Sequence, residues 1–311
     1  MALDPQMQAI LDQAAAAGGK PFHAMSPVEA RQAIDVMFAA FRGNPAEIGR
    51  VEDRKLPGPA GDIPVRIYSP AGRGPFGVLI YFHGGGWVIG NIETHDSLCR
   101  DLTKQAGIVT ISVDYRLAPE HKFPAAPEDC YAVTKWVGAN TALLSVDADK
   151  IAVGGDSAGG NLAAVVTLMA RDRGAPKIAY QALIYPATDA SNSTPSQKEF
   201  MKDGYILSKA DMDWFYGHYF KPGDSTNPYA SPALAKDLKG LPPALVLTAA
   251  YDPLRDEGEA YGEALRKAGV PVKISRYEGV CHGFVSMAAA LDEGKRAVAE
   301  IASELHKAIG T

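Results

Sequence analysis

Short apolar runs alternate with helical stretches from about residue 48 to the end of the chain. Several of these runs, such as 78–82 (VLIYF) and 244–247 (ALVL), contain no charged residue. Strands that are buried on both faces have this continuous pattern, which is typical of a mostly parallel sheet covered by helices. The pattern predicts eight strands, at residues 50–56, 65–68, 78–82, 108–113, 151–154, 182–185, 244–249 and 272–277.

Apolar residues at helical spacing fill the intervals between the strands and most of the first fifty residues. Ser26, Pro27 and Glu29 indicate a helix start, with an N-cap serine, a proline at the first helical position and a glutamate at the third. This order of elements predicts an α/β fold in a single domain of residues 1–311, with an open, doubly wound sheet and helices on both faces. The predicted helices cover residues 2–17, 27 to about 43, 126–136, 160–173 and 256–268.

Two segments depart from the alternation of strands and helices. The first is the helical N-terminus, and the second is the long interval between residues 185 and 244, which has no clear strand and contains the aromatic-rich helical stretch 211–220 (DMDWFYGHYF). Long excursions from a compact core are usually lids or binding elements. We expect residues 1–47 and about 187–225 to form a helical cap over the functional site of the protein. The alternative is that their aromatic side chains only pack against the core.

Composition excludes several classes of protein. The chain has 311 residues, 47% of them hydrophobic, and a formal net charge of -5, so it has no overall basic field for nucleic acid or anionic membrane. Three widely spaced cysteines without a CxxC pair predict neither a disulfide framework nor a zinc site. No apolar stretch reaches the roughly 18 residues of a membrane span, and the N-terminus lacks the features of a signal peptide. We therefore expect a cytoplasmic protein.

The strongest motif is G-x-S-x-G at residues 155–159 (GDSAG). It follows the strand predicted at 151–154 and opens the helix predicted at 160–173. A serine in such a turn is held in a strained conformation, with its hydroxyl exposed above the sheet. Ser157 is therefore the predicted nucleophile. The alternative is an ordinary glycine-rich turn between a strand and a helix.

A second glycine-rich segment, 83–86 (HGGG), directly follows the strand at 78–82. Successive glycines let backbone N–H groups approach an oxygen that becomes negatively charged during acyl transfer, where each donor lowers the barrier by about 3 kcal/mol. We predict Gly85, Gly86 and Ala158 as these donors, and a structural role for His83. The alternative is a phosphate-binding loop, but the segment lacks the spacings G-x-x-x-x-G-K-[ST] and G-x-G-x-x-G.

A serine nucleophile needs a base and an acid that orients the base. Of seven histidines, His282 lies just past the last predicted strand, at the edge of the sheet where sites of such folds form; His95 is the alternative. Asp252 directly follows the strand predicted at 244–249, and Asp256, in the first turn of the next helix, is the alternative acid. The chain order of serine, aspartate and histidine is the one expected on this fold.

At these residues the sequence resembles the bacterial hormone-sensitive-lipase family of α/β-hydrolases, the family IV esterases. The resemblance extends over about residues 50 to 290 and includes the motifs 83–87, 155–159, 252–256 and 282–284. It implies the α/β-hydrolase fold with a helical cap, and hydrolysis of short- to medium-chain carboxylic esters without a cofactor or metal. In that mechanism Ser157 attacks the ester carbonyl. Residues 113–116 (VDYR) also match the family, and we expect an internal ion pair there beneath the site.

The sequence leaves other functions and details open. Amide, carbamate or thioester hydrolysis would use the same residues, whereas a non-catalytic binding protein of this fold, like the plant gibberellin receptors, would lack a triad residue. A triglyceride lipase would need a long apolar lid, which is not evident. The strand predicted at 272–277 could be a sheet edge that pairs across a homodimer. Candidates for lining the substrate pocket, each equally compatible with core packing, are Trp87, Met212, Trp214 and Phe215.

Overall fold

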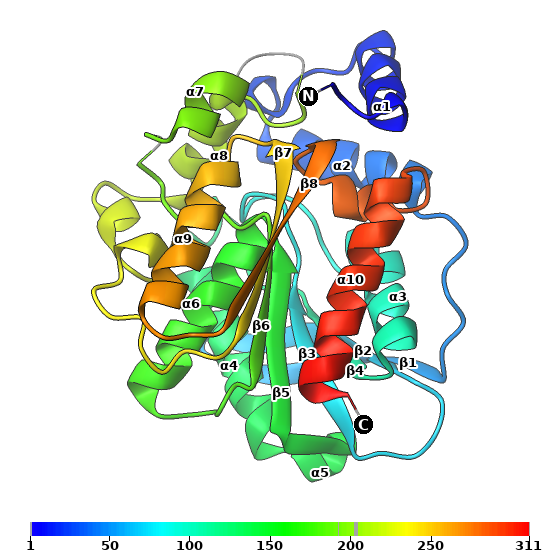
Figure 1. Ribbon diagram of the computed structural model, residues 1–311, viewed down its shortest axis with the longest axis vertical. Coiled ribbons are helices and arrows are strands. Elements are labelled where there is room, and N and C mark those ends of the chain that lie inside the picture. The colour runs from blue at the N-terminus through cyan, green and yellow to red at the C-terminus, as the bar shows by residue number, and fades with distance from the viewer. Residues whose placement is uncertain (1, 192, 202–204, 311) are drawn as a thin grey trace.

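The computed structural model describes residues 2–191, 193–201 and 205–310. Within these residues one eight-stranded sheet runs through the molecule (Figure 1). Its strands are β1 (Arg50–Gly58), β2 (Gly61–Ser69), β3 (Phe76–Phe82), β4 (Val109–Val113), β5 (Val146–Asp156), β6 (Tyr180–Ile184), β7 (Ala244–Tyr251) and β8 (Val272–Cys281). Their order in the sheet is β1-β2-β4-β3-β5-β6-β7-β8. β2 pairs antiparallel with both neighbours, and every pairing from β4 to β8 is parallel.

Helices cover both faces of this sheet, as the sequence predicts (Figure 1). α3 and α10 pack on one face, and α4, α6 and α9 pack on the other. The α-helices are α1 (Pro5–Ala16), α2 (Pro27–Phe41), α3 (Asp96–Ala106), α4 (Ala125–Ala139), α5 (Thr141–Leu144), α6 (Ala158–Arg173), α7 (Pro195–Phe200), α8 (Lys209–Tyr219), α9 (Arg255–Lys267) and α10 (Asp292–Ile309). The 3₁₀ turns are η1 (Phe22–Ala24), η2 (Glu93–His95), η3 (Asp224–Thr226), η4 (Pro232–Leu234) and η5 (Phe284–Met287).

The apolar run of β3 shows why continuous hydrophobicity predicts a central strand. Successive side chains of a strand point to opposite faces. Ile80 and Phe82 therefore belong to the core beneath α4 and α6, and Leu79 and Tyr81 belong to the core beneath α3 and α10. All four side chains are fully buried. The α/β fold and the eight predicted strands are confirmed, with bounds that agree at several ends and differ by at most five residues at the others.

The α-helices of the two segments that depart from the alternation lie beyond the carboxyl ends of the parallel strands (Figure 1). α1 and α2 come from the N-terminal segment, and α7 and α8 from the long insertion (Figure 1). α2 begins as predicted: the Ser26 hydroxyl accepts from the Glu29 N–H, and the Glu29 carboxylate accepts from the Ser26 N–H at 2.8 Å. Residues 1, 192 and 202–204 of the predicted cap lie outside the described residues.

β8 forms one edge of the sheet, as expected for the last predicted strand. Pairing of two chains through this edge remains a prediction. Among the residues that the structure describes, every helix is too short or too polar to cross a membrane.

Candidate active site

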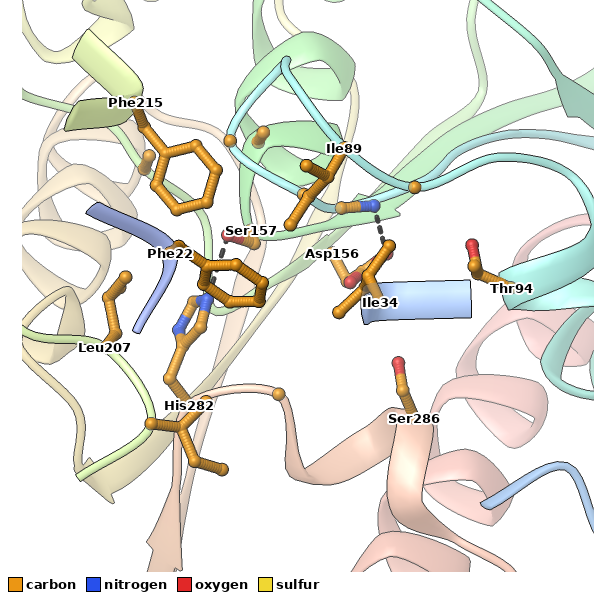
Figure 2. Close-up of a pocket in the computed structure, with 18 of the residues that line it drawn as sticks. Phe22, Ile34, Ile89, Thr94, Asp156, Ser157, Leu207, Phe215, His282 and Ser286 are labelled. Carbon is orange, nitrogen blue, oxygen red and sulfur yellow. Dashed lines mark hydrogen bonds between the residues drawn. The ribbon is translucent and has the colours of Figure 1, made fainter. Parts of the chain in front are cut away.

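Three of the predicted side chains meet where the parallel strands end. Ser157 follows β5, Asp252 follows β7 and His282 follows β8. The Nε2 atom of His282 lies 2.9 Å from the Ser157 hydroxyl oxygen (Figure 2), and its Nδ1 atom lies 2.7 Å from the Asp252 Oδ2 atom. A buried carboxylate accepts hydrogen bonds, so this geometry favours the neutral tautomer with the proton on Nδ1, which leaves Nε2 able to accept one. The arrangement is a relay from the hydroxyl through the imidazole to the carboxylate.

Ser157 occupies a strained turn between β5 and α6. Its backbone angles are φ 55 and ψ -117, a conformation that L-residues rarely adopt. Its N–H donates to the carbonyl of Ile184 at 2.8 Å, so β6 helps to hold the turn. Gly159 is required because an added Cβ would overlap the carbonyl oxygen of Phe82. The turn therefore has the geometry that the G-x-S-x-G motif predicts.

Asp252 is fixed by contacts to both of its carboxylate oxygens. The side chain is fully buried, and its Oδ1 atom accepts from the Leu254 N–H at 2.8 Å while Oδ2 faces His282. Asp256, the alternative acid, points elsewhere: its Oδ2 atom accepts from the Ser196 N–H at 2.7 Å, and its Oδ1 atom accepts from Arg255 at 2.8 Å. The structure therefore brings Asp252, not Asp256, to the histidine.

The three predicted oxyanion donors line the same pocket as Ser157 and His282. Gly85 has φ 116, which favours glycine, and its carbonyl accepts the N–H groups of Val88 and Ile89 in a tight turn. In the described part of the chain, the N–H groups of Gly85, Gly86 and Ala158 have no hydrogen-bond partner. Ala158 is also the first residue of α6, where backbone N–H groups lack intrahelical acceptors. These three N–H groups are therefore free to donate to a molecule bound beside Ser157.

Asp156 is a buried carboxylate that sequence reasoning did not single out. Its Oδ1 atom accepts from the Gly84 N–H at 2.9 Å and from the Tyr81 hydroxyl at 2.7 Å, and lies 3.1 Å from the His95 Nε2 atom. Burial would raise the pKa of this carboxyl, but His95 and the Tyr81 hydrogen bond outweigh burial, so the pKa of Asp156 is lowered. Asp156, which directly precedes Ser157, thus ties the glycine loop to the turn that carries Ser157. Its position inside the G-x-S-x-G motif is the signal that could have identified it.

His95, the alternative base, contacts Asp156 and does not hydrogen-bond to Ser157. His83 is fully buried and has the structural role that the sequence suggests. Its ring stacks on Tyr115 at 4.3 Å between centroids, and the Tyr115 hydroxyl donates to the His83 carbonyl at 2.7 Å. Burial lowers the pKa of His83 to about 4, so its imidazole is neutral near neutral pH. These contacts hold the start of the glycine loop against the core.

Asp156 provides a first prediction. Because its pKa is lowered on folding, the ionised carboxylate stabilises the fold above about pH 4, the ordinary aspartate range, and this contribution is lost as the pH falls toward the folded value. Asp156→Asn should lower the free energy of unfolding at pH 7 by about 1–3 kcal/mol, the contribution of hydrogen bonds to a charged group. Denaturant unfolding of both proteins from pH 7 down to pH 4 and below should show the difference shrinking. A difference that grows on acidification would contradict this account.

The ion pair expected within residues 113–116 has a different partner. Arg116 pairs with Asp129 of α4, at 2.7 Å, and donates to it through two guanidinium nitrogens. Within the described part of the chain the Asp114 side chain makes no ion pair, and burial raises the pKa of its carboxyl. The prediction of an ion pair within residues 113–116 is therefore wrong, because the pair joins the segment after β4 to α4. Sequence proximity alone gave no means of identifying Asp129.

An apolar pocket surrounds Ser157 (Figure 2). Trp87, Met212 and Phe215 line it, whereas Trp214 does not. Met212 and Phe215 lie three residues apart on α8 and so share one face of that helix. The prediction for Trp214 is therefore corrected: its ring packs edge-on against Phe215 and His218, at 5.0 and 4.5 Å between centroids. Lining residues that sequence reasoning missed include Phe22, Ile34, Phe38, Ile89, Leu207 and Met287.

Comparisons with known proteins agree with this architecture. A family model described as alpha/beta hydrolase fold matches residues 79–286. The chain is 36% identical to an ethyl acetate hydrolase of Pseudomonas putida, with 99% of both chains covered. It is 46% identical to carboxylic ester hydrolase LipN of Mycobacterium tuberculosis, covering 76% of this chain but 65% of the length of LipN. The solved structure of a hyperthermophilic esterase from the archaeon Pyrobaculum calidifontis superposes with a TM-score of 0.92 at 48% identity, covering 99% of each chain.

Proposed function

Because this chain belongs to the family IV, or hormone-sensitive-lipase, esterases of the α/β-hydrolase fold, we propose that it is a serine carboxylesterase acting on short- to medium-chain acyl esters. The observation that carries this proposal is the continuous relay from Ser157 through His282 to Asp252, with contacts of 2.9 and 2.7 Å. All three triad positions are occupied by residues competent for catalysis, which disfavours a non-catalytic binding protein. Amides, carbamates and thioesters would engage the same groups and remain secondary candidates.

Acylation begins when the Ser157 hydroxyl oxygen attacks the ester carbonyl carbon and His282 Nε2 takes the hydroxyl proton. The carbonyl oxygen becomes an oxyanion, which the N–H groups of Gly85, Gly86 and Ala158 stabilise by about 3 kcal/mol each. Asp252 stabilises the imidazolium that forms. The tetrahedral intermediate then collapses, His282 returns its proton to the departing alcohol, and the acyl group stays on Ser157.

Deacylation uses the same groups, with a water molecule as the nucleophile and the Ser157 oxygen as the leaving group. His282 Nε2 takes a proton from a water molecule, and the oxygen of that water attacks the acyl carbonyl carbon. The second oxyanion is held by the same backbone donors. On collapse the bond to the Ser157 oxygen breaks, His282 returns the proton to that oxygen, and the carboxylic acid leaves. The net reaction consumes one ester and one water.

The N-terminal segment and the insertion act together as the cap in this proposal. The Asp211 carboxylate on α8 lies 2.9 Å from the His23 Nδ1 atom and accepts the His23 N–H at 3.1 Å. The neighbouring Phe22 lines the pocket, with its ring 5.9 Å from that of Phe215 between centroids. These contacts join two segments distant in sequence above the nucleophile, and so support a shared cover.

The edge position of β8 supports the proposal of a homodimer through that strand.

The cysteines Cys99, Cys130 and Cys281 are buried and unpaired, which suits the proposed cytoplasmic location.

A panel of p-nitrophenyl esters with increasing acyl length tests the function. The value of kcat/KM should peak at about four to eight acyl carbons. Each methylene that fits the apolar pocket stabilises the transition state by about 1–3 kcal/mol, whereas a methylene beyond the pocket wall adds no such stabilisation. p-Nitroanilides of the same acids are the control for amide cleavage. A steady rise toward long, emulsified chains would contradict the assignment and favour a lipase, whereas faster cleavage of the anilides would favour an amidase.

A further inference from the structure

A second cavity lies next to the catalytic pocket. It is bordered by α3, by α10, by the residues that follow α2 and by those that follow η5. Its volume is about 410 Å³, compared with about 110 Å³ for the catalytic pocket. Ser286 of η5 is the residue that lines both cavities within the described part of the chain. Ser286 therefore belongs to the boundary of both the space around the nucleophile and the second cavity.

The backbone around Ser286 is firmly packed. η5 begins two residues after His282, and the Ser286 N–H donates to the Gly283 carbonyl at 3.1 Å. Its neighbours Val285 and Met287 are buried, at 0% and 5% exposure. The Ser286 hydroxyl is itself shielded from solvent. Since the backbone is fixed in this way, the side chain at position 286 is the part of this shared boundary that a substitution changes most directly.

The side of Ser157 on which Ser286 lies identifies the part of the substrate that it meets. His282 must protonate the departing alcohol, so the alcohol lies near His282 and the acyl chain extends away from it. In Figure 2, Ile34, Thr94 and Ser286 are drawn to the right of Ser157, whereas His282 and Leu207 are drawn to its left. We therefore assign the part of the pocket that Ser286 lines to the acyl chain.

The second cavity has an apolar part suited to methylene groups. Phe41, Leu98, Val285 and Val298 contribute to its lining, and Leu98 is only 6% exposed. The Ser97 hydroxyl donates to the Arg42 carbonyl at 2.7 Å and holds the segment after α2 against α3. The polar members of the lining include Arg42, Asp101, Gln105 and Lys295.

We propose that Ser286 is the end wall of the acyl site and sets the upper limit of acyl length, and that the cavity behind it is a latent extension for longer acyl chains. This inference rests on the proposed esterase function. It names the residue through which that site distinguishes short from long acyl groups. A smaller residue at position 286 joins the cavities, and a larger one shortens the acyl site.

The test compares Ser286→Gly and Ser286→Leu with the parent protein on p-nitrophenyl esters of two to twelve acyl carbons. The ratio of kcat/KM for the twelve-carbon to that for the four-carbon ester should rise roughly tenfold or more in Ser286→Gly and fall in Ser286→Leu. A double variant, Ser286→Gly with Ala288→Leu, partly fills the second cavity, since Ala288 lines it, and should cancel the gain. Because ratios are compared within each protein, partial loss of folded enzyme does not alter them.

The outcomes separate this inference from the function on which it rests. If the proteins hydrolyse the esters but the ratio stays the same in both single variants, the wall assignment is wrong and the esterase proposal stands. A change confined to a series of butyrate esters with varied alcohols would place Ser286 on the alcohol side and also overturn it. If the parent protein hydrolyses none of the esters, both proposals fail.

Discussion

Replacing Ser157 with alanine should lower kcat by about 10⁴-fold or more, because members of a catalytic relay act as a unit. The Ser157 hydroxyl contacts His282 at 2.9 Å, and alanine has no atom that could replace its oxygen as nucleophile. Steady-state hydrolysis of p-nitrophenyl butyrate by equal amounts of both proteins measures the effect.

The control for this variant is its stability. Alanine keeps the backbone strain of the turn and removes one hydrogen bond, so the unfolding free energy should change by about 1 kcal/mol or less. A folded variant with turnover like that of the parent protein would refute the assignment of the nucleophile.

Replacing Asp252 with asparagine should lower kcat by about 10⁴-fold, because the amide reverses the histidine tautomer. The Asp252 carboxylate accepts a hydrogen bond from His282 Nδ1–H, with 2.7 Å between Nδ1 and Oδ2. An asparagine amide would donate to Nδ1 instead, so the proton would move to Nε2 and the imidazole could no longer accept the Ser157 proton. The Leu254 N–H could still bind the remaining oxygen, so the local fold should persist.

Asp256→Asn is the matched control, since it makes the same chemical change four residues later. Asp256 holds the Ser196 N–H and Arg255, and neither contact reaches His282. This variant should lose some stability and keep most of its kcat. Equal losses of kcat in the two variants, or a larger loss in Asp256→Asn, would contradict the assignment of the acid.

The strands and the three catalytic candidates were accessible from the sequence because local signals and topology agree. A run such as 78–82 can be buried on both faces only in a central strand, and the motif at 155–159 places its serine after such a strand. In a parallel sheet the carboxyl ends of strands share one edge, so residues following β5, β7 and β8 were expected to lie near one another. Only the structure shows that His282 Nε2 lies 2.9 Å from the Ser157 hydroxyl oxygen and His282 Nδ1 lies 2.7 Å from Asp252 Oδ2.

The contacts that hold the glycine loop, residues 83–86, could not be derived from local sequence signals. Tyr81 and His95 reach Asp156 from β3 and η2, and nothing in their local sequence marks that convergence. Likewise, the partner of Arg116 lies on α4, which packs against the segment after β4 only once the sheet has formed.

The pocket lining shows a different limit of sequence reasoning. The stretch 211–220 was expected to contribute aromatics, but which face of α8 meets the pocket depends on how the helix packs. That orientation places Met212 and Phe215 inward and turns Trp214 toward His218. Phe22 was missed because it lies in a short 3₁₀ turn between two helices, where no periodicity marks a buried face.

We propose that His282 and Asp252 make the Ser157 hydroxyl more reactive than the other hydroxyls among the described residues. Labelling with a p-nitrophenyl alkylphosphonate, followed by mass spectrometry of the intact protein and its peptides, tests this claim most directly, since the phosphonate reacts with an activated serine and mimics the tetrahedral intermediate. We expect one equivalent of label, located on Ser157, with labelling strongly slowed in Asp252→Asn and absent in Ser157→Ala. Labelling of a different residue with loss of activity, or labelling of Ser157 at the same rate in Asp252→Asn, would contradict the account.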